Sequence, residues 1–124
     1  MQSLVCSREV LEMSLFVSEY SVGPITLLEL GDRWTADLIE ELRERMEKLE
    51  LEGRQLLLFD CGRIIIIDSS GVGALVRNWV SLAKRGGSLK LLRPSARMQE
   101  VLQTVGLRKL IESFDDVGDA LRSF

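Results

Sequence analysis

The residues best suited to chemistry are a carboxylate, two hydroxyls and two glycines in the segment Asp68-Ser69-Ser70-Gly71-Val72-Gly73. They stand where a run of apolar residues gives way to the periodic pattern of a helix. One oxygen would be enough to cap that helix, yet three side chains offer one. Gly71 and Gly73 fall in its first turn, where each glycine costs about 1 kcal/mol relative to alanine. Departures from local rules of this kind are typical of a functional site.

The electrostatics of a helix start suit a phosphate on one of the two hydroxyls. The free amide hydrogens and the helix dipole accommodate an anion there. A phosphate on Ser69 or Ser70 would add about −1.5 to −2 charges and three acceptor oxygens. We expect the fold to tolerate that phosphate, whereas a partner backbone lying close over Gly71 and Gly73 would not. The segment therefore indicates a binding switch, with simple helix capping as the alternative interpretation.

Enzymatic roles lack the residues that they need. The chain has no histidine, which excludes a Ser-His-Asp triad, a Cys-His pair and a His-ligated zinc. A serine hydrolase elbow has a glycine shortly before the serine, and this segment lacks it. A phosphate-binding loop continues into Gly-Lys-Ser/Thr, and this segment does not. Asp60 and Asp68 could pose as paired carboxylates, but Asp60 fits an ordinary residue at the end of a strand. The sequence predicts a protein without catalysis, cofactor or metal.

The two cysteines and the composition narrow the setting further. Cys6 and Cys61 lack CxxC spacing, and Cys61 is expected to be a small buried residue. The 16 basic and 19 acidic residues, a net charge of −3, disfavour binding to nucleic acid. Strictly apolar runs reach four residues, against about 20 for a membrane span, and no signal peptide pattern opens the chain. We therefore expect a cytoplasmic protein without membrane insertion, whose oligomeric state stays open.

The length of 124 residues suits one domain, expected over residues 13–124 after a lead segment at 1–12. Strands are expected at 15–20 and 25–30 as a hairpin, and at 88–92 and 110–114. The apolar runs at 55–60 and 64–67 predict strands buried on both faces. Helices are expected at 35–50 with Thr35 or Asp32 near the start, at 94–105, and at 115–124 opened by Asp115 or Asp116. Another helix is expected after the aspartate–serine segment, with a periodic apolar face from Val72 to Leu82 and its end at Arg85-Gly86-Gly87. Alternating strands and helices predict an α/β fold with a mostly parallel sheet.

Three stretches in this order, IIIIDSSGVGALV, KRGGSLKLL and VLQTVGL, resemble a STAS domain, the fold of bacterial anti-sigma factor antagonists. The best match covers about 56–121. The resemblance implies a single domain with a mostly parallel, mixed β-sheet and helices packed on it. It also implies that Ser69, directly after the aspartate, is the phosphorylated serine, with Asp68 and Ser70 completing the site.

The same resemblance implies the partners. In the family, the unphosphorylated antagonist binds an anti-sigma factor and frees the sigma factor. The anti-sigma factor is itself the serine kinase, phosphorylation ends the association, and a serine phosphatase restores it. A non-switching STAS subunit of a stress-sensing scaffold or of a lipid-transport ABC system is the alternative function, in which the serines would be caps. The tail of a membrane transporter is a further alternative for this fold.

The front half departs from the family pattern at Leu30-Gly31-Asp32-Arg33-Trp34-Thr35. The family usually has Gly-Glu-Leu-Asp there, followed shortly by a threonine. Asp32 and Thr35 align with it only when the residues between Gly31 and Asp32 are treated as deleted. On that alignment Asp32 would lie at the rim of the phosphate site. Trp34 beside it is either an ordinary packing residue or a contact for a partner.

Overall fold

The computed structural model describes residues 15–124, and the expected lead segment at 1–12 and Cys6 lie outside that range. The strands are β1 (Phe16–Val22), β2 (Ile25–Leu30), β3 (Arg33–Trp34), β4 (Leu56–Asp60), β5 (Ile66–Ile67), β6 (Ser88–Leu92) and β7 (Ser113–Phe114). The helices are the short 3-10 helix η1 (Ala36–Leu38) and the α-helices α2 (Ile39–Leu51), α3 (Ser69–Lys84), α4 (Ala96–Thr104) and α5 (Val117–Arg122).

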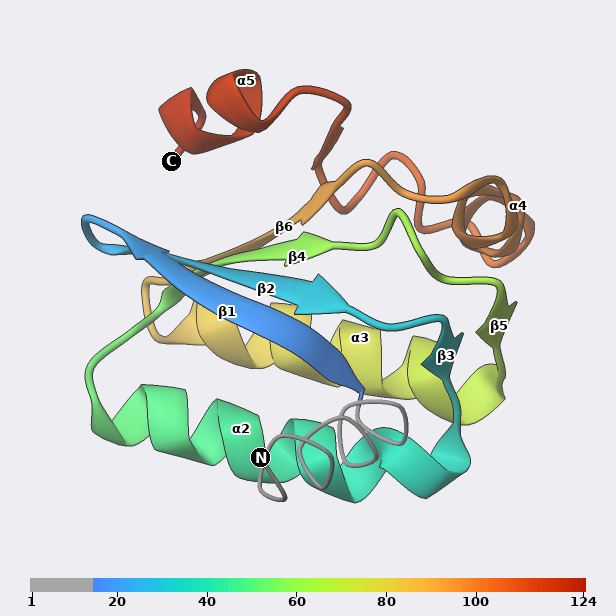
Figure 1. The fold of residues 1–124 in the computed structure, drawn as a ribbon, viewed down its shortest axis with the longest axis horizontal. Helices are drawn as coiled ribbons and strands as arrows, with labels where there is room; N and C mark the ends of the chain where they lie inside the picture. The colour runs from blue at the N-terminus through green and yellow to red at the C-terminus, as the bar shows by residue number, and fades with distance from the viewer. Residues whose placement is uncertain (1–14) are drawn as a thin grey trace, which may run out of the picture.

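Five strands form the main sheet in the order β1-β2-β4-β6-β7 (Figure 1). The pair β1 and β2 is antiparallel, and every other neighbouring pair is parallel. The predicted hairpin is confirmed, and Gly23 supplies the positive φ that its turn requires. The mixed, mostly parallel α/β architecture expected from the sequence is therefore confirmed.

Helices cover both faces of this sheet. Figure 1 shows α2 and α3 under one face, α5 over the other, and α4 at the end next to β5. The larger core lies between the sheet and α2 and α3, and includes Phe59, Leu42 and Leu75. A smaller core under α5 contains Leu58 and Ala120. Because neighbouring residues of β4 face the two cores, the expectation that this strand is buried on both faces is confirmed.

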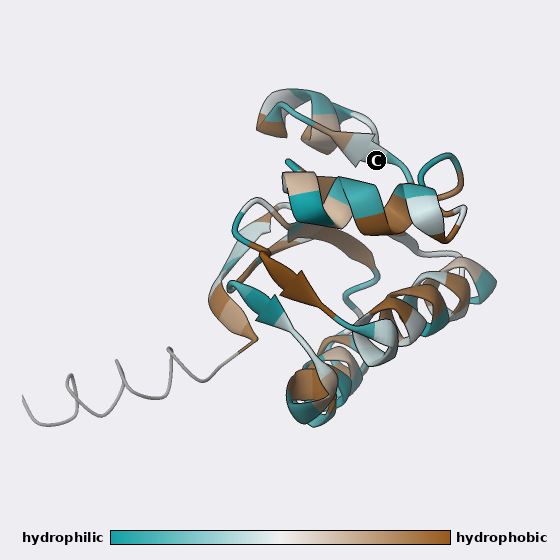
Figure 2. Cartoon of the chain, turned by 90° about the vertical axis from the view of Figure 1, so that its right-hand side faces the viewer, coloured by the Kyte–Doolittle hydropathy of each residue, from teal (hydrophilic) through white to brown (hydrophobic). Residues whose placement is uncertain are grey.

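The run Ile64–Ile67 is not a second buried strand of the main sheet, so that prediction was wrong. Only its last two residues form a strand, β5, which pairs in parallel with β3 in a separate two-stranded sheet. Figure 2 shows these two short strands side by side. Ile64 and Ile67 are buried, whereas Ile65 is 63% exposed and Ile66 48% exposed. One face of the segment packs on the core, and two isoleucines reach solvent just before Asp68.

Several predicted boundaries shift. The strand expected at 110–114 is reduced to β7, and the helix expected at 94–105 begins at Ala96 with a Ser95 cap. The helix expected at 35–50 opens as η1, and neither proposed residue caps it: Thr35 has no capping hydrogen bond, because its hydroxyl donates to the Asp37 carboxylate. Of the two caps proposed for the terminal helix, Asp116 is confirmed.

Candidate functional site

Asp68 holds the start of two helical segments with one carboxylate. Its backbone is extended, its Oδ1 accepts from the Gly71 amide at 2.9 Å, and its Oδ2 accepts from the Ala36 amide at 3.0 Å. The amide hydrogens of Gly71 and Ala36 lower the pKa of the Asp68 carboxyl. The cap missing from η1 is therefore supplied by a residue 32 positions later in the chain.

Backbone hydrogen bonds tie the segment around Asp32 to the same place. The Asp32 carbonyl accepts from the amides of Ile65 at 2.8 Å and Ile66 at 3.1 Å. The Trp34 carbonyl accepts from the Asp68 amide at 3.3 Å. The Asp32 side chain is exposed and has no hydrogen bond or ion pair within residues 15–124. The pairing of β3 with β5 thus places the Asp32 backbone beside Ile65 and Ile66, at the end of β5 away from Ser69, and its place at the rim of a phosphate site stays a prediction.

Ser69 and Ser70 are the first two residues of α3, and both are exposed. Neither hydroxyl has a hydrogen-bond partner among the residues that the structure describes, since Asp68 already caps the helix. The interpretation of the serines as caps was therefore wrong. Both hydroxyls face solvent at the positive end of a helix of 16 residues.

The two glycines of the first turn have different surroundings. Gly71 is buried, and a Cβ on it would lie 2.4 Å from the Trp34 carbonyl oxygen. The backbone that lies close over Gly71 is the chain's own strand β3, so the expectation of a partner's backbone over this glycine was wrong. Gly73 is half-buried, and among residues 15–124 a Cβ there would meet only the Arg77 guanidinium, at 3.2 Å. Of the two, Gly73 lies on the accessible side of the helix.

Trp34 is completely buried, so its interpretation as a partner contact was wrong. Its ring packs against Phe59 with centroids 5.9 Å apart, and its Cδ1 would lie 3.1 Å from a Cβ on Gly71. Its Nε1 is a buried polar atom without a hydrogen-bond partner in the described part of the chain. Trp34 thus packs directly against the first turn of α3 at Gly71.

Asp60 and Cys61 have structural surroundings. Asp60 ends β4 almost fully buried, where Oδ2 accepts from Arg93 at 2.6 Å and Oδ1 accepts from the Gly62 amide at 3.1 Å. Cys61 is a free, fully buried thiol, as expected, and burial raises its pKa. Residues 15–124 contain no cluster of three or more histidine, cysteine, aspartate or glutamate side chains that could hold a metal ion.

Replacing Asp68 by asparagine is expected to reduce the acid sensitivity of the fold. A carboxyl whose pKa is lowered by folding stabilises the protein fully above its unfolded pKa, and that stabilisation is lost as the pH falls through the folded value. The plot of unfolding free energy against pH should therefore be shallower for Asp68→Asn than for the wild type between about pH 5 and pH 2. Urea denaturation across that range measures it, and equal slopes would contradict the double cap.

Sequence reasoning missed two parts of this site. The first is the exposure of Ile65 and Ile66. The run Ile64–Ile67 has four residues and leads almost directly into a helix, so it leaves little length for a strand of the main sheet. The contact of Asp68 with Ala36 carries no local signal, since it depends on how β3 pairs with β5.

The arrangement defines a small α/β module with an exposed serine pair at a helix start. A model of the STAS domain family matches residues 21–120, and the chain belongs to that family. The match includes the segment around Asp32 where the sequence departs from the family's usual pattern. No curated protein sequence matches the chain.

Solved structures share this fold at low sequence identity. TM1081 of Thermotoga maritima has a TM-score of 0.80 with 17% identity, over 87% of this chain and 92% of its own. The Bacillus anti-sigma factor antagonist SpoIIAA, in its unphosphorylated form, has a TM-score of 0.71 with 22% identity, over 86% and 96%. The murine anion transporter Slc26a9 has a TM-score of 0.70 with 16% identity, over 82% of this chain and 18% of the transporter. This fold thus occurs both in an anti-sigma factor antagonist and in part of an anion transporter.

Among residues 15–124, each helix is too short or too polar to cross a bilayer.

Proposed function

We propose that this chain is an anti-sigma factor antagonist that is switched off by phosphorylation of Ser69. The observation that carries the proposal is the free, exposed Ser69 hydroxyl at the start of a helix that Asp68 already caps. A phosphate can be added there without removing a contact that the fold needs. The likeness to SpoIIAA, of which a phosphorylated form has been solved, supports the same role.

In this proposal the unphosphorylated surface binds an anti-sigma factor kinase and thereby frees a sigma factor. The kinase transfers a phosphoryl group from ATP to the Ser69 oxygen, and a serine phosphatase removes it. The chain itself performs no catalysis, needs no cofactor and acts in the cytoplasm. Its STAS domain spans residues 13–124.

The surface beside Ser69 suits a protein partner. Ile65 and Ile66 offer apolar area, and Ser70 offers a second exposed hydroxyl without a partner in residues 15–124. Half-buried Gly73 lies under the end of the exposed Arg77 side chain. Asp68 and buried Gly71 contribute by holding the helix start in place. The Asp32 backbone accepts hydrogen bonds from the amides of the exposed isoleucines, which supports a place for Asp32 at the edge of the proposed surface.

Ser69→Ala is expected to abolish phosphorylation, and Ser70→Ala is the matched control. Both hydroxyls are exposed and lack partners within residues 15–124, so neither substitution should disturb the fold. The purified proteins would be incubated with ATP and each anti-sigma factor kinase of the source genome, and the phosphate located by mass spectrometry. We expect phosphate on the wild type and Ser70→Ala only. Phosphate that persists on Ser69→Ala would overturn the site assignment.

A second candidate function is a STAS subunit that does not switch, in a scaffold or a transport system. The likeness to part of the anion transporter Slc26a9 favours it. In that case the start of α3 would form a permanent interface. Stable copurification with transport or scaffold proteins, with Ser69 unmodified in cells, would favour it over the antagonist.

A further inference from the structure

Arg77 lies two turns into α3 and differs from the other arginines of residues 15–124. It is the one arginine in that range without a hydrogen bond or ion pair to the described residues. Each of the others contacts a carboxylate, a hydroxyl, an amide oxygen or a carbonyl oxygen: Arg33, Arg43, Arg45, Arg54, Arg63, Arg85, Arg93, Arg97, Arg108 and Arg122.

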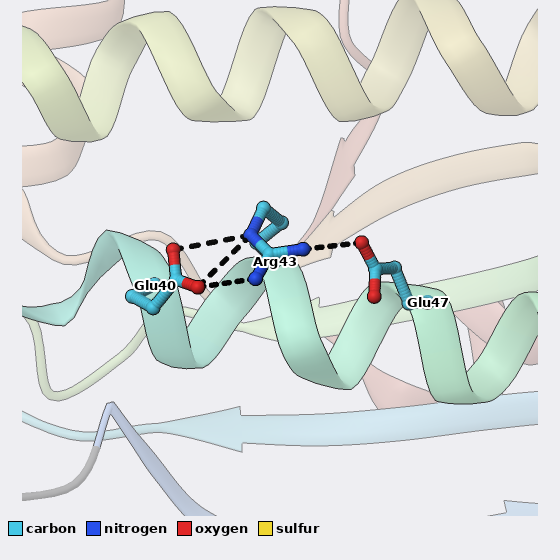
Figure 3. A network of polar contacts seen from close by, with 3 residues as sticks. All are labelled: Glu40, Arg43 and Glu47. Atoms are coloured by element: carbon cyan, nitrogen blue, oxygen red, sulfur yellow. Dashed lines mark hydrogen bonds and ion pairs between the residues drawn. The ribbon is translucent and has the colours of Figure 1, made fainter.

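The groove between α2 and α3 explains why Arg77 is left without a carboxylate. This groove of about 310 Å³ is lined by arginines and by Glu47 and Glu50. Figure 3 shows Arg43 of α2 holding Glu40 on one side and Glu47 on the other. Arg85 pairs with Glu50 at 3.2 Å. Both glutamates that line the groove therefore already have an arginine, and the positive charge of Arg77 is unmatched.

The Arg77 side chain turns back toward the start of its own helix, as helical side chains do. Its Nη1 lies 3.2 Å from the point where a Cβ on Gly73 would be. The missing side chain of Gly73 thus leaves room for the guanidinium one turn closer to Ser69. Positions four apart on a helix are neighbours, with Cβ atoms about 5–6 Å apart, so Ser69 is the neighbour of Gly73 on the N-terminal side.

We propose that Arg77 binds the phosphate of phosphorylated Ser69 across Gly73. This inference rests on the proposed phosphorylation of Ser69 and assigns a residue to its recognition within the chain. An arginine presents paired N–H donors that match phosphate oxygens, and such charge-assisted bonds are about twice as strong as neutral ones. The Arg77 guanidinium already lies over Gly73 in the unmodified chain, and the phosphate would be added beside it. Phosphorylation thereby changes the shape of this surface as well as its charge.

Other charged groups near Ser69 act on the phosphate in every variant. The Asp68 carboxylate is its chain neighbour, and Asp37 on η1 is near enough to raise the pKa of Asp68. These carboxylates oppose ionisation of the phosphate, whereas the free amides of α3 favour it. A substitution of Arg77 leaves all of them in place, so the difference between variants isolates the guanidinium.

The test installs phosphoserine at position 69 during translation, so no kinase is needed. The pKa of the second phosphate ionisation, ordinarily about 6, is measured by ³¹P NMR titration in the full chain. We expect Arg77→Gln to raise that pKa by about half a unit relative to the wild type. Lys84→Gln is the matched control, because Lys84 is a cation on the same helix at its far end. It should leave the phosphate pKa at the wild-type value.

Equal phosphate pKa values for the wild type and Arg77→Gln would overturn the role of Arg77. An equal rise in Lys84→Gln would also overturn it, because the effect would then be general charge rather than contact. Without phosphate, Arg77→Gln should melt at the wild-type temperature, since Arg77 has no partner to lose within residues 15–124. If none of the anti-sigma factor kinases modifies Ser69, the proposed function is overturned, whereas this titration of the installed phosphoserine remains valid.

Discussion

Gly71→Ala is expected to destabilise the protein by about 3 kcal/mol, a large share of the roughly 5–15 kcal/mol that separates the folded from the unfolded state of a typical domain. The added Cβ would lie 2.4 Å from the Trp34 carbonyl oxygen, and it would also press on the side chains of Trp34 and Ile67 at 3.1 Å. A backbone oxygen cannot turn aside as a flexible side chain can. Because that oxygen belongs to β3 and accepts from the Asp68 amide, the strain would spread through the whole serine site.

Gly73→Ala is the matched control for this substitution. It adds the same methyl group two residues later in the same helix, where only the mobile end of Arg77 must move. We expect its stability to equal the wild type or to rise by up to about 1 kcal/mol, since alanine favours the helix. Urea denaturation of the two variants measures the difference. Equal stability of Gly71→Ala and Gly73→Ala would show that β3 does not lie against α3 as described.

The sequence predicted most of the fold because most of its elements are coded locally. The hairpin follows from two apolar stretches around a Gly-Pro turn, and α3 follows from its three- and four-residue periodicity. Strand β4 was recognisable as a continuous apolar run flanked by polar residues. The same rule failed for Ile64–Ile67, because a continuous apolar run cannot distinguish a central strand from a short segment with one face on the core.

The candidate site was located from sequence, but its internal contacts were not. The serine pair stands out because two glycines break the pattern of a helix start. Gly71 is needed for packing and Gly73 is not, because Trp34 lies against Gly71. The burial of Trp34 in turn follows from the pairing of β3 with β5. Pairing between segments 33 residues apart has no signature in either segment.

A phosphate on Ser69 is expected to weaken binding of the proposed partner, an anti-sigma factor kinase, about 100-fold. An interface built on the neutral Ser69 and Ser70 hydroxyls and on exposed Ile65 and Ile66 would have to dehydrate a double negative charge. An unpaired charge in an interface costs about 2–5 kcal/mol, which corresponds to a loss of affinity from about 30-fold to several thousand-fold, and 100-fold lies in the lower part of that range. The fold should survive, because the start of α3 favours an anion.

Ser69→Asp carries part of this effect without any kinase. Its carboxylate has one negative charge and fewer acceptor oxygens than a phosphate, so we expect a smaller loss of affinity in the same direction. Its circular dichroism spectrum should match that of the wild type. Loss of the folded spectrum would mean that Ser69 is mainly a structural residue.

The most direct test of the switch is an isothermal titration of the anti-sigma factor kinase, without ATP, into three forms of the full chain. These forms are the unmodified chain, the chain with phosphoserine installed at position 69, and Ser69→Ala. We expect the unmodified chain and Ser69→Ala to bind with similar affinity, and phosphoserine at position 69 to lower the affinity about 100-fold. Equal binding by the phosphorylated and unmodified chains would contradict the proposal that Ser69 is the switch.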